Sequence, residues 1–330
     1  MRVVAAPDKF RGTATAAEVA AAVGRAATAA GWDCDEVPLA DGGEGTLEVL
    51  GGPNRTSLVT GPLGDPVEAA WRLRRGTAVV ESARASGLEL VGGAEGNDAV
   101  SASTYGTGEL IATAVELGAR RVIVALGGSA TTDGGLGALR ALHPVQRLRA
   151  IDLVVASDVR TRFTDAAEVF GPQKGATPAQ VELLRRRLER LAQIYLEDHG
   201  VDVTDIDGAG AAGGLAGGLA AVGAEVVSGF DLLADELALD EVVEGADLVV
   251  TGEGFVDAQS FDGKVVGGVV ELAASLDVPV LVVAGQVFDG LEERIDAEAL
   301  VDRVGDEAAR TDTVASVEAV VAERLRAWGG

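Results

Sequence analysis

Three lysine residues are the first sign of chemistry in this sequence, because they are the only lysines among its 27 basic residues. Arginine supplies all the others, so a retained lysine marks a place that needs a compact ammonium group rather than a planar guanidinium. All three stand in polar segments that contain glycine, at Lys9, Lys174 and Lys264. Ammonium groups in such loops are suited to neutralising the phosphate or carboxylate groups of a small anionic ligand.

Carboxylates accompany glycine in two segments near the N-terminus, residues 6–13 (APDKFRGT) and 40–46 (ADGGEGT). Glycine frees the backbone to approach a ligand closely. A helix-capping turn is the alternative for the first segment, and a solvated turn for the second, although a turn does not explain both of its acids. We interpret both as ligand-binding loops, with Asp8, Lys9, Arg11, Asp41, Gly42, Gly43 and Glu44 as candidate residues.

A third glycine-rich segment, residues 127–135 (GGSATTDGG), follows a strand-like apolar run. It offers successive backbone N–H groups, three hydroxyl groups and the Asp133 carboxylate at the start of a helix, which is typical of phosphate binding. A tight packing turn is the alternative, since a glycine-rich strand-to-helix loop alone is a weak signal. The candidate binding residues are Gly127, Gly128, Ser129, Thr132 and Gly134.

Several classes of protein are excluded or disfavoured by composition and motifs. The pattern GxxxxGK[ST] does not occur and no GxGxxG opens a helix in a βαβ context, which disfavours ordinary P-loop and dinucleotide-binding proteins. One cysteine and two unrelated histidines support neither a disulfide framework nor a zinc site. The net charge of −25 disfavours binding to nucleic acid and anionic lipid.

The N-terminus runs straight into a strand-like segment without the features of a signal peptide, and no apolar run is long enough to span a membrane. These features predict a cytoplasmic protein.

Strand-like runs alternate with helical patterns, which predicts an α/β protein with parallel sheets and crossover helices. The pattern of strand-like and helical runs is more alike at the two ends of the chain than in the middle. We therefore expect a discontinuous domain of residues 1–63 and 235–330, with residues 64–234 inserted as a second α/β domain. Residues 180–196 predict a half-buried amphipathic helix. Residues 208–218 fit either a tightly packed helix or a loop against a ligand. The strand and helix pairs are residues 2–6 and 16–30, 122–126 and 135–142, 246–250 and 265–275, and 278–283 and 314–328.

Seven segments, taken in order, resemble the class I glycerate kinase family. They are APDKFRG, ADGGEGT, TYGTGELI, GGSATTDGG, FGPQKGAT, GAGAAGGLAGGL and DLVVTGEG with the following D and GK, and they cover nearly the whole chain. The resemblance implies ATP-dependent phosphorylation of D-glycerate, usually to 2-phosphoglycerate. It also implies a Rossmann-like or flavodoxin-like domain with an inserted α/β domain. Two departures from the family are a shortened stretch between Leu142 and Ile151, and Phe255 where an arginine usually follows TGEG.

For such a kinase we expect Lys9, Lys174 and Lys264 to neutralise ATP phosphates or the glycerate carboxylate, and the segment 127–135 to donate N–H groups to phosphate oxygens. Glu253 or Asp257 would hold Mg²⁺. Either Asp41 or Asp133 would be the general base for the glycerate hydroxyl. The candidate catalytic residues are thus Asp41, Asp133, Lys174 and Lys264, in a monomer or homodimer.

Two other kinds of protein remain as alternatives. A nucleotide- or glycerate-binding regulatory protein that has lost catalysis would account for Phe255 and the shortened stretch. A dinucleotide oxidoreductase on a similar sheet would leave the three lysine-containing loops unexplained.

Overall fold

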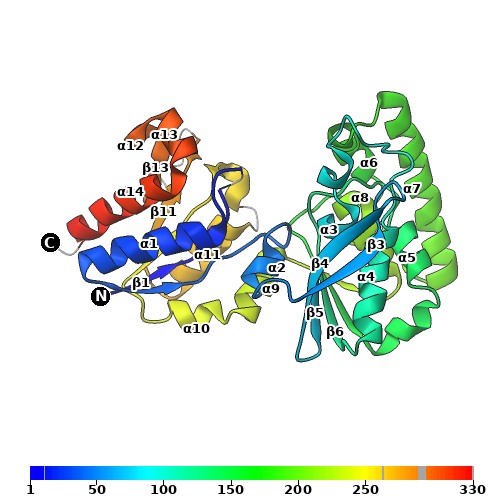
Figure 1. Ribbon diagram of the computed structural model, residues 1–330, viewed down its shortest axis with the longest axis horizontal. Coiled ribbons are helices and arrows are strands. Elements are labelled where there is room, and N and C mark those ends of the chain that lie inside the picture. The colour runs from blue at the N-terminus through cyan, green and yellow to red at the C-terminus, as the bar shows by residue number, and fades with distance from the viewer. Residues whose placement is uncertain (11, 262–263, 289–294, 329–330) are drawn as a thin grey trace. The chain divides into compact units, whose positions relative to one another are not determined.

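The computed structural model describes residues 1–10, 12–261, 264–288 and 295–328, and it divides the chain into two compact units (Figure 1). Unit 1 comprises Met1–Asp41 and Phe230–Gly330, and unit 2 comprises Gly42–Gly229. Unit 1 is therefore built from both ends of the chain. None of the helices in the described ranges combines the length and the apolar character that crossing a bilayer requires.

The centre of unit 1 is a five-stranded sheet in which every neighbouring pair is parallel. The strands are apolar because helices cover both faces of such a sheet, and β9 is buried along its whole length. In spatial order they are β13 (Ala297–Ala299), β11 (Val280–Ala284), β9 (Leu248–Thr251), β1 (Arg2–Ala5) and β2 (Asp33–Glu36).

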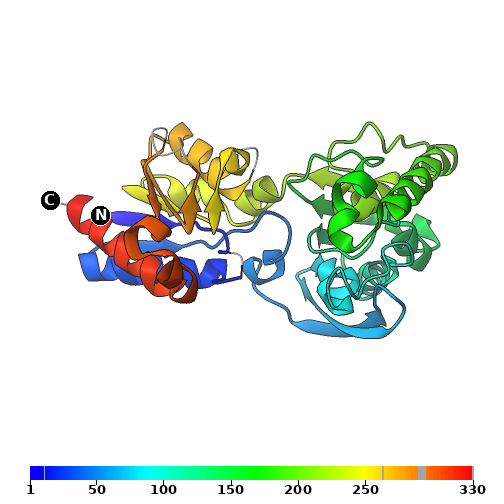
Figure 2. The same cartoon turned by 90° about the horizontal axis from the view of Figure 1, so that it is seen from above.

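Two long helices, α1 (Ala16–Ala30) and α14 (Thr313–Trp328), lie side by side on one face of this sheet (Figure 2). The Thr15 hydroxyl accepts a hydrogen bond from the Glu18 N–H and caps the start of α1. The other face is covered by α9 (Gly229–Glu236), α10 (Leu239–Val243) and α11 (Val265–Ser275). Unit 1 also contains α12 (Leu300–Val304), α13 (Asp306–Thr311), the 3₁₀ helix η4 (Ala258–Phe261) and a parallel strand pair, β10 (Phe255–Val256) and β12 (Gln286–Val287).

Unit 2 contains a six-stranded sheet in the order β3 to β8, antiparallel between β3, β4 and β5 and parallel from β5 to β8. Strand β3, which precedes the domain boundary expected from the sequence, pairs with β4 in this sheet. The strands are β3 (Arg55–Thr60), β4 (Pro66–Arg74), β5 (Thr77–Glu81), β6 (Arg121–Ala125), β7 (Asp152–Ala156) and β8 (Glu225–Val227).

The longest helix of unit 2 is α7 (Pro178–His199), which buries Leu184, Leu188 and Tyr195 and confirms the predicted amphipathic helix. Shorter helices surround the sheet. They are α2 (Thr46–Val49), α3 (Ala83–Ser86), α4 (Tyr105–Glu116), α5 (Leu136–Ala141), α6 (Ala166–Phe170) and α8 (Ala211–Ala221), with the 3₁₀ helices η1 (Glu89–Val91), η2 (Val145–Ala150) and η3 (Pro172–Lys174).

The glycine-rich residues 208–218 pack backbone against backbone on the segment 127–135. Near its start α8 is interrupted by three left-handed residues, Ala212, Gly213 and Gly214. The Gly134 N–H donates a 3.0 Å hydrogen bond to the Gly213 carbonyl. A Cβ atom at Gly213 would lie only 1.9 Å from the Thr131 carbonyl oxygen. Of the two interpretations of this segment, the structure supports tight packing.

Replacing Gly213 with alanine tests this backbone contact against a matched control. Both Gly213 and Gly200 have a left-handed backbone, but only Gly213 has neighbouring atoms within 4 Å of an added Cβ. We expect Gly200→Ala to cost about 1 kcal/mol in unfolding free energy from backbone strain, and Gly213→Ala to cost about 1–3 kcal/mol more from overpacking. Denaturant unfolding of both variants measures the difference, and equal costs would contradict the close contact.

Candidate functional site

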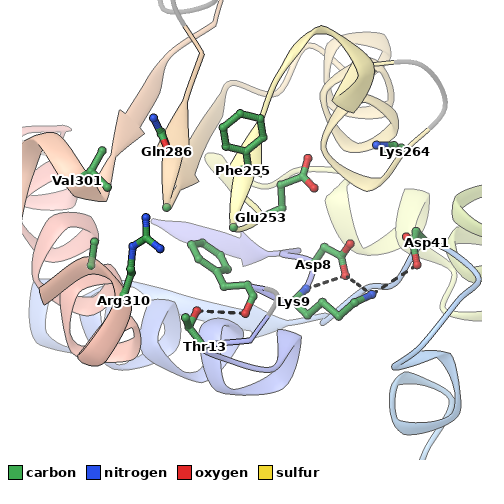
Figure 3. Close-up of a pocket in the computed structure, with 14 residues that line it drawn as sticks. Asp8, Lys9, Thr13, Asp41, Glu253, Phe255, Lys264, Gln286, Val301 and Arg310 are labelled. Atoms are coloured by element: carbon green, nitrogen blue, oxygen red, sulfur yellow. Dashed lines mark hydrogen bonds and ion pairs between the residues drawn. The ribbon is translucent and has the colours of Figure 1, made fainter. Parts of the chain in front are cut away.

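A cavity of about 460 Å³ opens at the carboxyl ends of β1, β9 and β11 in unit 1 (Figure 3). This is the edge at which parallel α/β sheets bind their ligands. Hydrogen bonds hold the three loops together, from the Asp8 N–H to the Gly252 carbonyl and from the Gly285 N–H to the Glu253 carbonyl. The lining residues include Asp8, Lys9, Phe10, Thr13, Asp41, Glu253, Phe255, Lys264, Gln286, Val301, Ala309 and Arg310.

Lys9 lies between two carboxylates of this cavity. Its ammonium nitrogen is 3.5 Å from Asp41 Oδ1 and 3.9 Å from Asp8 Oδ1. The Lys9 backbone N–H also donates a 2.7 Å hydrogen bond to Asp8 Oδ1. The expected ligand-binding segment 6–13 therefore meets Asp41 in one site, while Arg11 lies outside the described residues.

Two carboxylic acids in the cavity have raised pKa values. Burial is the largest cause for Asp8 and raises its pKa to about 7; Lys9 opposes this shift, and the negative charges of Asp41 and Glu253 add to it. Burial also raises the pKa of Glu253, and a hydrogen bond from Ser260 and the attraction of Lys264 oppose this shift. Glu253 Oε1 is buried and accepts no hydrogen bond from any described residue. The site thus holds poorly solvated negative charge that a bound cation would stabilise.

Lys264 occupies the N-cap position of α11, and its side chain lines the same cavity as Lys9. Two of the three lysines are therefore brought together, although they are separated by more than 250 residues of sequence. Parallel strands explain this, because loops that follow different strands meet at one edge of the sheet.

Lys174 belongs to unit 2 and is buried in its interior. Its side chain is only 3% exposed, and its ammonium group donates a 2.6 Å hydrogen bond to the Thr131 carbonyl. Burial lowers the pKa of Lys174 to about 7, and the charge of Asp133 partly opposes this shift. The Asn97 side chain also links the two segments, because its amide nitrogen donates hydrogen bonds to the Ala130 and Lys174 carbonyls. These contacts fix the shape of the segment 127–135.

The Asp133 carboxylate is engaged by several donors within unit 2. It accepts hydrogen bonds from the Thr104 N–H and hydroxyl, and from the backbone N–H groups of Gly135 and Gly137. It therefore joins the starts of α4 and α5. A carboxylate whose oxygens are occupied in this way is poorly placed to accept a proton from a substrate.

Gly42, Gly43 and Glu44 lie beside the start of the segment 127–135. The Leu126 N–H donates a 2.9 Å hydrogen bond to the Gly42 carbonyl, and a Cβ atom at Gly127 would lie 3.1 Å from the Gly43 Cα. Within unit 2, two of the predicted loops are thus neighbours at the carboxyl end of β6.

Sequence reasoning missed Glu81, which supports one of these loops. Its buried carboxylate accepts 2.9 Å hydrogen bonds from the Gly45 and Leu47 N–H groups and pairs with Arg84 at 3.0 Å. A signal was present, since Glu81 is an acid at the end of an apolar strand-like run.

The two predicted metal ligands have different surroundings. Glu253 lines the cavity, whereas Asp257 accepts hydrogen bonds from the Ser260 N–H and hydroxyl at the start of η4. In the part of the chain that the structure describes, no group of three or more acidic, histidine or cysteine side chains is arranged to hold a metal ion.

The sequence matches the model of the glycerate kinase family over residues 3–145 and 143–326. The glycerate 2-kinase of Escherichia coli is 39% identical over 329 residues, covering 88% of this chain and 86% of that protein. The glycerate kinase of Bacillus subtilis is 38% identical over 327 residues, covering 87% and 85%. A crystal structure assigned as glycerate kinase 2 of Salmonella typhimurium LT2 superposes with a TM-score of 0.82 at 34% identity, covering 100% of this chain and 99% of that one.

The raised pKa of Asp8 predicts a pH-dependent gain in stability for Asp8→Asn. Above pH 7 the folded protein carries a buried charge there, whereas the unfolded chain ionises Asp8 near its ordinary pKa of 3.8. Ionisation therefore lowers the stability of the folded state progressively from about pH 4 to pH 7. We expect Asp8→Asn to raise the thermal midpoint by a few degrees at pH 8 and by less near pH 5.5.

Calorimetry of the parent, Asp8→Asn and Asp65→Asn at several pH values measures this effect, with Asp65 as an exposed control. A gain from Asp8→Asn that did not shrink as the pH fell would contradict the assignment.

Proposed function

The chain belongs to the glycerate kinase family, and from this membership we propose that it transfers the γ-phosphate of ATP to D-glycerate and forms 2-phosphoglycerate. The observation that best supports this proposal is the convergence of Lys9 and Lys264 on one cavity lined by carboxylates. A cytoplasmic location and a monomeric or homodimeric state stay predictions from the sequence.

Phosphoryl transfer needs charge cancellation and alignment more than covalent chemistry by the protein. In our proposal Lys9 and Lys264 bind the oxygens of the ATP phosphates. Their ammonium groups come from loops that follow different strands, so they can approach a polyphosphate from two directions. The protein carries a net charge of −25, and such local cations are needed to bind an anion at all.

Magnesium fits the donor chemistry of this cavity. The buried Glu253 Oε1, which has no hydrogen-bond partner among the described residues, is an oxygen ligand of the kind that Mg²⁺ prefers. When bound with ATP, the ion would neutralise charge on the phosphates. We propose Glu253 as its ligand and, because Asp257 caps η4, give Asp257 no more than an indirect part.

Asp41 is the stronger of the two candidates for the general base. Its side chain is 36% exposed, lines the cavity and pairs with the Lys9 ammonium group. The oxygens of Asp133 instead accept hydrogen bonds from backbone N–H groups and from Thr104. We therefore propose that Asp41 accepts the proton of the glycerate hydroxyl and that Asp133 maintains the shape of the segment 127–135.

The segment 127–135 keeps its proposed part as a source of N–H donors to phosphate oxygens. Lys174 acts in this proposal as a positioning residue, because its ammonium group is buried against the Thr131 carbonyl. This assignment changes the role expected from the sequence, in which Lys174 contacts ATP or glycerate directly.

A coupled assay of ADP release with ATP and D-glycerate tests the reaction, and phosphorus NMR of the product identifies the hydroxyl that is phosphorylated. We expect turnover that depends on both substrates and on Mg²⁺, with 2-phosphoglycerate as the product. Binding of ATP and glycerate without turnover would instead support a regulatory protein.

Paired substitutions separate the two candidate bases. We expect Asp41→Asn to lower kcat by roughly 10²- to 10⁴-fold, the usual effect of losing a general base, with little change in thermal stability. Asp133→Asn should instead lower the unfolding free energy by about 1–3 kcal/mol, because an amide group cannot accept all of the hydrogen bonds. Steady-state kinetics and denaturant unfolding measure both effects.

The dependence of kcat on pH, measured for the parent and both variants, can contradict this assignment. If Asp133→Asn removed an ionisation from the profile while Asp41→Asn kept the parent kcat, the two roles would be reversed.

A further inference from the structure

The cavity in unit 1 has two chemically different ends. Lys9, Asp41 and Lys264 lie on one side in Figure 3, Val301 and the single charged residue Arg310 lie on the other, and Gln286 and Phe255 lie between them. The buried ring of Phe10 and the methyl group of Ala309 add apolar surface to the lining. One half of the cavity therefore suits a polyanion and the other half suits a flat, weakly polar group.

Phe255 is the most unusual residue of the apolar half, because 43% of its surface is exposed. It starts β10, whose pairing with β12 places it opposite Gln286. Its ring meets that of Phe288 edge to face, with 5.9 Å between the ring centroids. Phe288 is itself 58% exposed, so the edge contact leaves much of both rings open to solvent. An exposed aromatic ring that lines a cavity is typical of a ligand-binding surface.

D-Glycerate does not account for this half of the cavity. Its three carbons carry a carboxylate and two hydroxyl groups, so it has no apolar face to cover an aromatic ring. A nucleobase has two such faces, and stacking on aromatic side chains is a general way of binding bases. The volume of about 460 Å³ lies in the range of cavities that enclose ligands larger than glycerate.

We propose that the Phe255 half of this cavity is the nucleobase subsite, in which the adenine of ATP stacks on the Phe255 ring. The inference rests on the proposed function and specifies how ATP is oriented in the cavity, with its base at Phe255 and its phosphates at Lys9 and Lys264. The Gln286 side chain stands beside the stacked base and offers an amide donor and acceptor to its edge. Arg310, which pairs with Asp306 at 2.9 Å, borders the same half.

The proposed subsite explains why this chain can have Phe255 where the resemblance to the family places an arginine. At this position the Phe255 ring contributes stacking in place of the arginine that the family usually has.

The test compares ATP with inorganic tripolyphosphate, which has the phosphates but no base. We expect Phe255→Leu, which keeps apolar bulk but removes the aromatic face, to weaken ATP binding by roughly 5- to 150-fold. The same variant should leave competition by tripolyphosphate unchanged, and Phe255→Tyr should bind ATP like the parent. Leu58→Ala, at an exposed position of β3, is the control for loss of an exposed apolar side chain.

Calorimetric titration of the full chain with ATP and displacement by tripolyphosphate give these affinities without any need for turnover. Equal weakening of ATP and tripolyphosphate by Phe255→Leu, or no weakening of ATP, would overturn the nucleobase subsite. The kinase assay of the parent protein is a separate readout, so that a parent without turnover on D-glycerate would refute the proposed function while the titration still decides the subsite.

Discussion

The structure of the site depends on negative charge held out of water. Asp8 is buried, Glu253 keeps one oxygen without a hydrogen-bond partner among the described residues, and Asp41 shares Lys9 with Asp8. In a protein with a net charge of −25, this arrangement costs stability unless cations compensate it. We propose that Lys9, Lys264 and a Mg²⁺ ion bound with ATP provide that compensation, so that binding relieves a cost already present in the unliganded protein.

In unit 2 the main structural feature is a glycine-rich segment, residues 127–135, whose conformation is fixed by its neighbours. Glycine alone would leave residues 127–135 without a defined conformation. Three sets of contacts hold the segment: packing against Gly213, the hydrogen bonds between Asp133 and Thr104, and the hydrogen bond from the buried Lys174 ammonium group. A loop held in this way can present N–H groups to a ligand without paying much conformational entropy on binding.

The sequence predicted the α/β fold with parallel sheets, and it predicted helices such as 16–30 and 265–275 with the observed bounds, because a helical pattern is a local feature of the sequence. It also predicted the loops that line the cavity, since strand ends converge. It could not separate Lys174 from Lys9 and Lys264, because burial depends on residues distant in sequence. For the same reason the sequence did not predict that Asp133 accepts hydrogen bonds from Thr104. It also did not predict that Glu81 accepts them from the loop after Gly43.

The central claim is that the cavity of unit 1 binds the phosphates of ATP through Lys9 and Lys264. A crystal structure of the full chain with Mg²⁺ and a non-hydrolysable ATP analogue tests it most directly. We predict phosphate oxygens within hydrogen-bonding distance of both ammonium groups. An analogue bound with its phosphates remote from Lys9 and Lys264 would contradict the account.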